Sequence, residues 1–375
     1  MANKDIFDDP FDEGTLTKLE IFEKYLEEWL PTFVLGSFNK PIQIFDLFAG
    51  IGYDKIRQEG SPIRILKIIN KFRDVIEKQN KKVCICLNDY NSNKYNALKK
   101  NVERKIDELS LSSIIKLSIT NLAFSKCLQI YHNELSNGCN LLFIDQNGFK
   151  EVNEEIFQYL IKLETTEFIF FLSSSHIHRF ATIPEVQKVH PKFDFKKIES
   201  ASRKEVHNVI CTEYHKYIPK SINNYLLIPF SIMKSDNNNV YGLIFVCKHP
   251  LAADKFLDTL WSKNQINGNA NFDIDDDLSK IQPDLFDGTR LTKIESFQGI
   301  LKVKILEKEI ENNVQAYYFT LNSGHIHNHA DQIVREMKKQ KLIYYEGTSP
   351  LINYEQVVKK RRLLNFRVND ENDQN

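Results

Sequence analysis

The amino-acid sequence predicts an α/β fold in which a parallel sheet carries helices on both faces. Short apolar runs alternate five times with helical stretches between residues 41 and 172. Two further apolar runs, 225–232 and 240–247, flank the polar segment 234–239, a spacing typical of a hairpin. The expected sheet therefore has seven strands, and its last two strands are antiparallel to each other.

The expected elements follow one another with short connections. A helix is predicted from about 16 to 30, with a capping box formed by Thr17 and Glu20 and with Pro31 at its end. Strands are predicted near 41–48, 82–88, 114–119, 141–144 and 168–172, and helices at 62–79, 93–109, 122–136 and 153–164. Residues 173–220 are polar and partly helical, and we interpret them as an insertion beside the ligand-binding edge of the sheet.

Changes in composition divide the chain into five segments. The basic region between Arg290 and Val368 holds 14 Lys and Arg against 8 Asp and Glu, and it predicts a winged-helix-like module. The segments are an N-terminal helical segment at 1–40, the α/β domain at 41–264 with its insertion at 173–220, a linker at 265–290, the module at 291–368 and a disordered tail at 369–375.

The composition is that of an ordinary globular protein without a membrane span. The 375 residues carry a net charge of zero, and 42% of them are hydrophobic. No apolar run is long enough to cross a bilayer, and the acidic start lacks the pattern of a signal peptide. The six cysteines form no CxxC pair and several lie in apolar runs, so we expect buried thiols and a cytoplasmic protein.

The stretch 42–52 is the strongest candidate for a ligand site. An apolar strand ends at Asp46 and is followed by Phe48, Ala49, Gly50 and Gly52. Glycines at such a turn let the backbone bend tightly and let a ligand approach it closely. Because ligands of open α/β sheets bind at the carboxyl ends of the strands, the pattern favours a nucleotide-like cofactor. The leading candidate is S-adenosylmethionine. An ordinary strand-to-helix turn is the alternative.

Two later strand ends extend this candidate site. Asp89 follows the second strand, where an acidic side chain can accept hydrogen bonds from both ribose hydroxyls. The alternative for Asp89 is the N-cap of the next helix. Asn121 follows the third strand, at a position suited to contact an adenine ring.

Taken with its flanks, the turn resembles the three-Cys-motif partner (TcmP) family. The matching pieces lie in order over residues 20–345, most of the chain. They are the runs 24–31 (KYLEEWLP), 46–53 (DLFAGIGY), 60–62 (GSP), 143–145 (FID) with Gly148, 242–251 (GLIFVCKHPL), and 319–321 (FTL) with His329 and Ala330.

The resemblance implies a class I methyltransferase-like sheet, Rossmann-like, and a C-terminal helical module. It also implies S-adenosylmethionine as cofactor and a partner protein with three clustered cysteines that is thought to hold an iron–sulfur centre. Family members carry Asp-Pro-Phe-Gly after the fourth strand, whereas this chain has Asp145, Gln146, Asn147, Gly148 and Phe149. In the related amino-methyltransferase motif, an Asp holds the acceptor amine and an aromatic ring stacks on the base. Asp145, Asn147 and Phe149 are therefore the candidate catalytic residues, without the stiffening proline.

Several alternatives stay open at this point. The chain could be a cofactor-binding or scaffold partner that has lost its chemistry, or a DNA-binding regulator acting through its C-terminal module. Methylation of an amino group on DNA or RNA is a further hypothesis. Contact between the basic run 359–362 and nucleic acid is another. Cytosine-C5 methylation is disfavoured because no Pro-Cys dipeptide occurs. His325 and His329 share a helical face, but no metal is expected there.

Overall fold

The computed structural model describes residues 10–222, 225–233, 239–274, 276–281 and 291–369. The chain divides into two compact units, Met1–Cys247 and Lys248–Asn375. The sequence placed this boundary near 264. It lies earlier because the helix α12 (Pro250–Lys263) packs on α15 (Asn313–Asn322) of the second unit.

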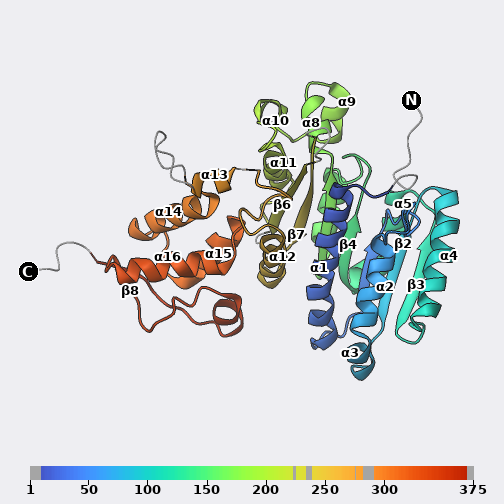
Figure 1. The fold of residues 1–375 in the computed structure, drawn as a ribbon, viewed down its shortest axis with the longest axis horizontal. Coiled ribbons are helices and arrows are strands. Elements are labelled where there is room, and N and C mark those ends of the chain that lie inside the picture. Colours follow the sequence, from blue (N-terminus) through green and yellow to red (C-terminus); the bar gives the residue numbers. More distant parts are fainter. Residues whose placement is uncertain (1–9, 223–224, 234–238, 275, 282–290, 370–375) are drawn as a thin grey trace, which may run out of the picture. The chain divides into compact units, whose positions relative to one another are not determined.

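The first unit is built on a seven-stranded sheet (Figure 1). Its strands run in the order β3-β2-β1-β4-β5-β7-β6. The first five are parallel, and β7 is antiparallel to both β5 and β6. This layout confirms the expected class I methyltransferase-like sheet. The strands are β1 (Ile42–Asp46), β2 (Val83–Asn88), β3 (Ile115–Thr120), β4 (Cys139–Ile144), β5 (Thr166–Leu172), β6 (Leu226–Met233) and β7 (Val240–Cys247).

Helices cover both faces of this sheet because the strands are apolar on both sides. On one face α1 (Glu13–Leu35) lies beside α2 (Ser61–Lys71), and its Phe22 stacks on Phe143 of β4 at 4.3 Å. On the other face, Phe157 and Tyr214 join Phe168 and Phe170 in one buried cluster. The remaining helices are α3 (Arg73–Lys78), α4 (Ser92–Glu108), α5 (Phe124–Ile130), α6 (His132–Asn137), α7 (Glu154–Lys162) and α11 (Val206–Tyr214).

The helix α1 is longer than predicted at both ends. Its N-cap is Asp12, whose side chain accepts a hydrogen bond from the Thr15 N–H at 2.7 Å, while Thr17 is buried inside the helix. Pro31 lies within the helix rather than at its end. The proline removes one helical hydrogen bond. Burial of Phe33 and Val34 in the next turn offsets that loss.

The insertion after β5 folds into α8 (Ser174–Arg179), α9 (Pro184–Val189) and α10 (Phe195–Ser200), and α11 follows. Although its composition is polar, an aromatic cluster anchors it to the sheet. His190 stacks on Phe193 at 4.5 Å, and both rings lie near Tyr214 and Tyr217. The insertion is therefore part of the first unit's core.

A buried histidine locks this insertion to β7. His207 is fully buried, and its Nε2 donates to the Leu243 carbonyl oxygen at 2.9 Å. With Nε2 protonated, Nδ1 accepts from the Ser174 hydroxyl at 2.7 Å. Burial lowers the pKa of His207 to about 4, so the ring is neutral near neutral pH. A Cβ atom at Gly242 would lie 2.2 Å from the ring.

Gly242→Ala is therefore expected to destabilise the protein by about 3 kcal/mol, through overpacking and loss of hydrogen bonds. Urea unfolding measures the change. Gly299→Ala is the control, because Gly299 lies inside α14 (Lys293–Leu306) and a Cβ there meets no atom within 4 Å. It should stabilise the helix by about 1 kcal/mol. Equal unfolding midpoints for Gly242→Ala and the unsubstituted protein would rule out this locking role.

The second unit contains helices and a minimal antiparallel pair. Of the expected strand segments, Ile343–Tyr344 (β8) pairs with Arg367–Val368 (β9). The segment near 357–362, which was predicted as a strand, is not one. Glu355–Lys359 forms a helical turn, and the Val357 N–H donates to the Asn353 carbonyl oxygen. The winged-helix assignment stays a prediction. The helices are α12, α13 (Asp277–Ile281), α14, α15 and α16 (His327–Lys339).

The expected linker is structured over part of its length. Asn264 donates to the carbonyl oxygens of Ala270 and Phe272, and Asn267 is buried. Residues 275 and 282–290 of the predicted linker and 370–375 of the predicted tail lie outside the described residues. Among the helices that the structure describes, none is long and apolar enough to cross a membrane.

Candidate functional site

The three predicted strand-end carboxylates meet at one edge of the sheet. Asp46 is paired in register with Leu87 of β2 and Phe143 of β4. Asp89 and Asp145 follow these two strands directly, so both lie beside the end of β1. The strand order reverses at β1 and β4, which is where ligands bind in sheets of this kind.

The turn after β1 has the backbone geometry that the glycines suggested. Gly50 has φ of 63° and Gly52 has φ of 86°, conformations that residues with a Cβ rarely adopt. The turn is fixed on two sides, since the Ala49 N–H bonds to the Asn88 carbonyl and the Gly60 N–H to the Gly52 carbonyl, both at 2.9 Å. Ala49 is buried, which leaves little room for a larger side chain.

Phe48, another predicted cofactor residue, faces the core. Its ring lies 5.2 Å from that of Phe124, and it packs against the buried cluster on one side of the sheet. Its backbone N–H donates to Asp46 Oδ1 at 3.3 Å. The side chain of Phe48 thus supports the turn from within the fold.

Asp46 is the most unusual group at this edge. The residue is fully buried, and Oδ2 has no hydrogen-bond partner among the described residues, although the nearby Ser61 hydroxyl lowers its pKa. Burial is the largest effect and raises the pKa of Asp46 to about 7, and the negative charges of Asp145 and Asp89 add to it. A buried carboxylate oxygen without a donor is costly unless a ligand supplies one.

Asp89 braces the glycine turn. Its Oδ2 accepts from the Gly50 N–H at 3.0 Å and its Oδ1 from the Asn91 N–H at 2.9 Å. The alternative of Asp89 as a helix N-cap is wrong, because Asn91 caps α4 through bonds from Asn93 and Lys94. The half-buried carboxylate links the ends of β1 and β2.

Asn121 holds the chain that follows β2. Its Nδ2 donates to the carbonyl oxygens of Asp89 at 2.7 Å and Tyr90 at 2.8 Å. Only Oδ1 of its side-chain amide is therefore left for the predicted adenine contact. The side chain of Tyr90 is 76% exposed next to Asp89, and it was not among the residues predicted from sequence. An aromatic residue directly after a strand-end acid was the available signal.

Asp145 has a cationic partner that the sequence did not reveal. Lys18 Nζ of α1 lies 2.6 Å from Oδ1 and 2.5 Å from Oδ2 of Asp145. Lys18 is only 6% exposed, and its Nζ lies 4.6 Å from the centre of the Phe171 ring. Its position four residues before Phe22, on the apolar face of the predicted helix, was the one available signal.

The loop after β4 is rigid without a proline. Gln146 is buried, donates to the Phe171 carbonyl at 3.0 Å and accepts from the Glu151 N–H at 2.8 Å. Asn147 is exposed at its tip. Phe149 is 2% exposed, and His176 and His190 flank it. The ring of Phe149 thus lies in the core, and its stacking on a substrate base stays a prediction.

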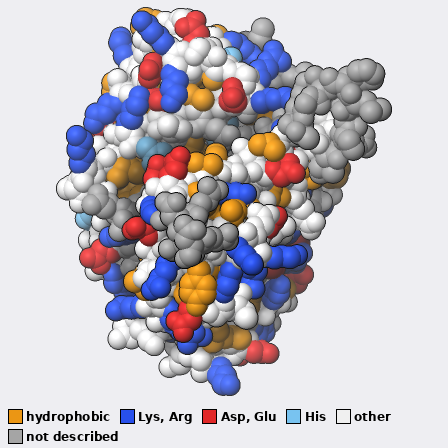
Figure 2. Space-filling model, turned by 90° about the vertical axis from the view of Figure 1, so that its left-hand side faces the viewer, with side chains coloured by type: hydrophobic (Ala, Val, Ile, Leu, Met, Phe, Trp, Pro, Cys, Tyr) orange, Lys and Arg blue, Asp and Glu red, His pale blue; other side chains and the backbone are white. Residues whose placement is uncertain are grey.

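The two predicted features of the second unit have local partners. Lys359 and Lys360 both pair with Glu355, at 3.2 and 3.4 Å. In the face shown in Figure 2, basic side chains are intermixed with acidic and apolar ones. Nucleic-acid contact by the run 359–362 stays a prediction.

The histidine pair of the second unit packs among aromatic rings. His325 and His329 lie 3.0 Å apart between their Nδ1 atoms, and His325 stacks on Phe297 at 4.1 Å. Burial lowers the pKa of His325 to about 2 and that of His329 to about 4. In the described part of the chain, no group of three or more His, Cys, Asp or Glu residues could hold a metal ion.

Comparison with known proteins found similar solved structures but no matching family model or curated protein. An O-methyltransferase from Bacillus cereus, solved in complex with SAH, is 12% identical and has a TM-score of 0.33, covering 64% of this chain and 92% of its own. The methyltransferase domain of bacterial CtHen1-C is 12% identical with a TM-score of 0.29, covering 59% and 97%. The METTL16 methyltransferase domain is 9% identical with a TM-score of 0.29, covering 60% and 66%.

Proposed function

We propose that this chain is a methyltransferase that binds S-adenosylmethionine at the carboxyl edge of β1, β2 and β4. The observation that carries the proposal is Asp46 Oδ2, a fully buried oxygen to which no described residue donates a hydrogen bond, beside a turn of two positive-φ glycines. An ammonium group is the kind of partner that such a carboxylate favours.

The other residues of this edge fit the remaining parts of the cofactor. Gly50 and Gly52 leave the backbone open for the amino-acid portion. Asp89 can accept from ribose hydroxyls, since a carboxylate has about four acceptor sites. The exposed ring of Tyr90 offers a face for the adenine. When bound, S-adenosylmethionine supplies an electrophilic methyl group.

The residues of the acceptor side would orient a nucleophile. Lys18 donates one hydrogen bond to each oxygen of Asp145, which leaves acceptor capacity on both oxygens. An amine could therefore donate to Asp145 while the two hydrogen bonds of the Gln146 side chain hold the loop after β4 in place. Holding the amine in line with the methyl group is the main contribution that the protein has to make. We propose an amino group, with nucleic acid as the candidate substrate.

We further propose that the chain belongs to the three-Cys-motif partner type and acts with a three-cysteine protein. The support is the ordered set of motifs from residue 20 to 345. Co-purification of the full chain with such a protein tests the assignment, and independent elution of the two proteins at micromolar concentration would refute it.

A non-catalytic cofactor-binding protein is the second candidate. Two observations favour it: the ring of Phe149 is buried, and Lys18 neutralises Asp145. Transfer of a radiolabelled methyl group to DNA, RNA or the partner protein separates the two candidates. Cofactor binding without transfer to any of them would favour the second.

Asp89→Ala is expected to weaken binding of S-adenosylhomocysteine about tenfold to a hundredfold, through loss of hydrogen bonds to the ribose and release of the Gly50 N–H. Asp89→Asn is the matched control, because it keeps one acceptor oxygen, and it should bind with intermediate affinity. Isothermal calorimetry measures both. Unchanged affinity of Asp89→Ala would remove Asp89 from the proposed site.

A further inference from the structure

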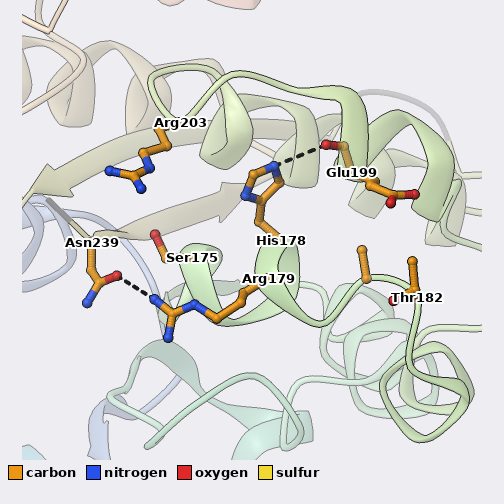
Figure 3. Close-up of a pocket in the computed structure, with 8 residues that line it drawn as sticks. Ser175, His178, Arg179, Thr182, Glu199, Arg203 and Asn239 are labelled. Carbon is orange, nitrogen blue, oxygen red and sulfur yellow. Dashed lines mark hydrogen bonds between the residues drawn. The ribbon is translucent and has the colours of Figure 1, made fainter.

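A polar pocket of about 330 Å³ opens in the insertion that follows β5 (Figure 3). Its walls come from α8 and the turn after it, from α10 and the segment after it, and from the residue before β7. The lining includes Ser175, His178, Arg179, Thr182, Arg203 and Asn239. Its volume lies at the lower end of the range for small-molecule sites.

The pocket is positively charged and rich in hydrogen-bond donors. Arg179 donates to the neutral Asn239 Oδ1 at 3.0 Å, which leaves four other N–H donors on its guanidinium group. Arg203 has neither an ion pair nor a hydrogen bond to any described residue. Among the described lining residues, the one carboxylate is that of Glu199, and in Figure 3 it lies on the far side of His178 from both guanidinium groups. Among the described residues, no carboxylate pairs with either guanidinium group that faces the pocket.

One further donor, the hydroxyl of Ser175, comes from the hydrogen-bond pattern around the pocket. Ser175 Oγ accepts from the Val240 N–H at 2.7 Å, so its own hydroxyl hydrogen is left to donate to a ligand. His178 Nε2 donates to the Glu199 carbonyl at 3.2 Å, which fixes the imidazole at the wall. In Figure 3, Ser175 lies between the guanidinium groups of Arg179 and Arg203.

The pocket adjoins the loop of the proposed acceptor site. The Ser173 N–H, just before α8, donates to the Gly148 carbonyl at 3.0 Å. The rings of Phe149 and His176 lie 5.4 Å apart. A ligand group held in the pocket is therefore connected through a few residues to Asp145 and its loop.

We propose that this pocket binds a phosphate group of the methyl acceptor and so holds the acceptor in place beside the β4 loop. Planar guanidinium groups bind phosphate oxygens through paired hydrogen bonds, and hydroxyl and amide donors complete such a site. The proposal that the pocket binds phosphate rests only on the side chains that line it. The identification of the ligand as the methyl acceptor rests on the proposed function.

The test uses the full chain and fluorescence anisotropy of a labelled single-stranded oligonucleotide, with adenosine monophosphate and adenosine as competitors. Arg203→Gln and Arg179→Gln should each weaken oligonucleotide binding about tenfold, the loss expected for one charged hydrogen-bonding group. Lys196→Gln is the matched control, because it removes an exposed cation of α10 that does not line the pocket. Glu199→Gln should tighten binding.

Competition identifies the source of the phosphate. If the monophosphate competes and adenosine does not, a free nucleotide suffices. If only unlabelled oligonucleotide competes, the pocket requires a phosphodiester chain. Absence of oligonucleotide binding, or equal binding by Arg203→Gln, Arg179→Gln and Lys196→Gln, overturns the proposal.

Calorimetry with S-adenosylhomocysteine on the same variants separates this proposal from the proposed function. All of these variants should bind S-adenosylhomocysteine as the unsubstituted chain does. Phosphate binding without S-adenosylhomocysteine binding would keep the pocket and reject the methyltransferase. The reverse result would reject the pocket alone.

Discussion

Asp46→Asn is expected to weaken binding of S-adenosylhomocysteine more than thirtyfold at pH 8, because an amide cannot replace the charge that faces the cofactor's ammonium group. Hydrogen bonds between charged groups contribute about 1.5–3 kcal/mol, and a buried pair contributes more. The substitution keeps the size and shape of the side chain, so the turn should keep its geometry. Calorimetry at pH 8 measures the loss. Equal affinity of the two proteins would exclude Asp46 from the cofactor site.

The same substitution should stabilise the free protein at high pH. The pKa of Asp46 is raised from 3.8 to about 7, mainly by burial. The folded state therefore binds this proton more tightly than the unfolded state, and the stabilisation is complete below pH 3.8 and lost as the pH rises through 7. The melting temperature of Asp46→Asn should exceed that of the unsubstituted chain by more at pH 8 than at pH 5. A difference that does not change with pH would contradict the raised pKa.

Lys18→Met is the second substitution with a large expected effect. It leaves the Asp145 carboxylate, 23% exposed, without the ammonium group that lies 2.5 Å away. Removal of one partner of a buried ion pair costs about 3–5 kcal/mol, and the partial exposure of Asp145 places the expected loss near the lower limit. Urea unfolding measures the loss. The double variant Lys18→Met with Asp145→Asn should recover most of it, since no unpaired charge remains.

Lys24→Met provides the matched control on the same helix. Lys24 pairs with Glu20 at 3.2 Å, and both side chains are well exposed, so the loss should stay below about 1 kcal/mol. If Lys18→Met were no more destabilising than Lys24→Met, the ion pair with Asp145 would not hold α1 to the end of β4.

The sheet could be predicted from sequence because its strands are apolar, short and separated by clear turns. The strand 240–247 was predicted with the bounds that β7 has. The ends of α1 were missed because the burial of Phe33 and Val34, a tertiary effect, carries the helix past Pro31. The domain boundary was missed for the same reason, since the packing of α12 on α15 cannot be read from composition.

The candidate site was predictable where a residue acts through its place at a strand end. Asp46, Asp89 and Asp145 meet as expected because parallel strands align their carboxyl ends. Lys18 was missed, since its contact with Asp145 joins positions 127 residues apart. The ring of Phe149 is buried in the core, which its residue type did not reveal. The side-chain amide of Asn121 donates to two backbone carbonyl oxygens, which its residue type did not reveal either.

A crystal structure of the full chain grown with S-adenosylhomocysteine tests the central claim most directly. We expect the ligand's amino group at Asp46 Oδ2, its amino-acid portion over Gly50 and Gly52, and its ribose at Asp89. A ligand bound elsewhere in the molecule, with Asp46 Oδ2 still lacking a donor, would contradict the proposed cofactor site.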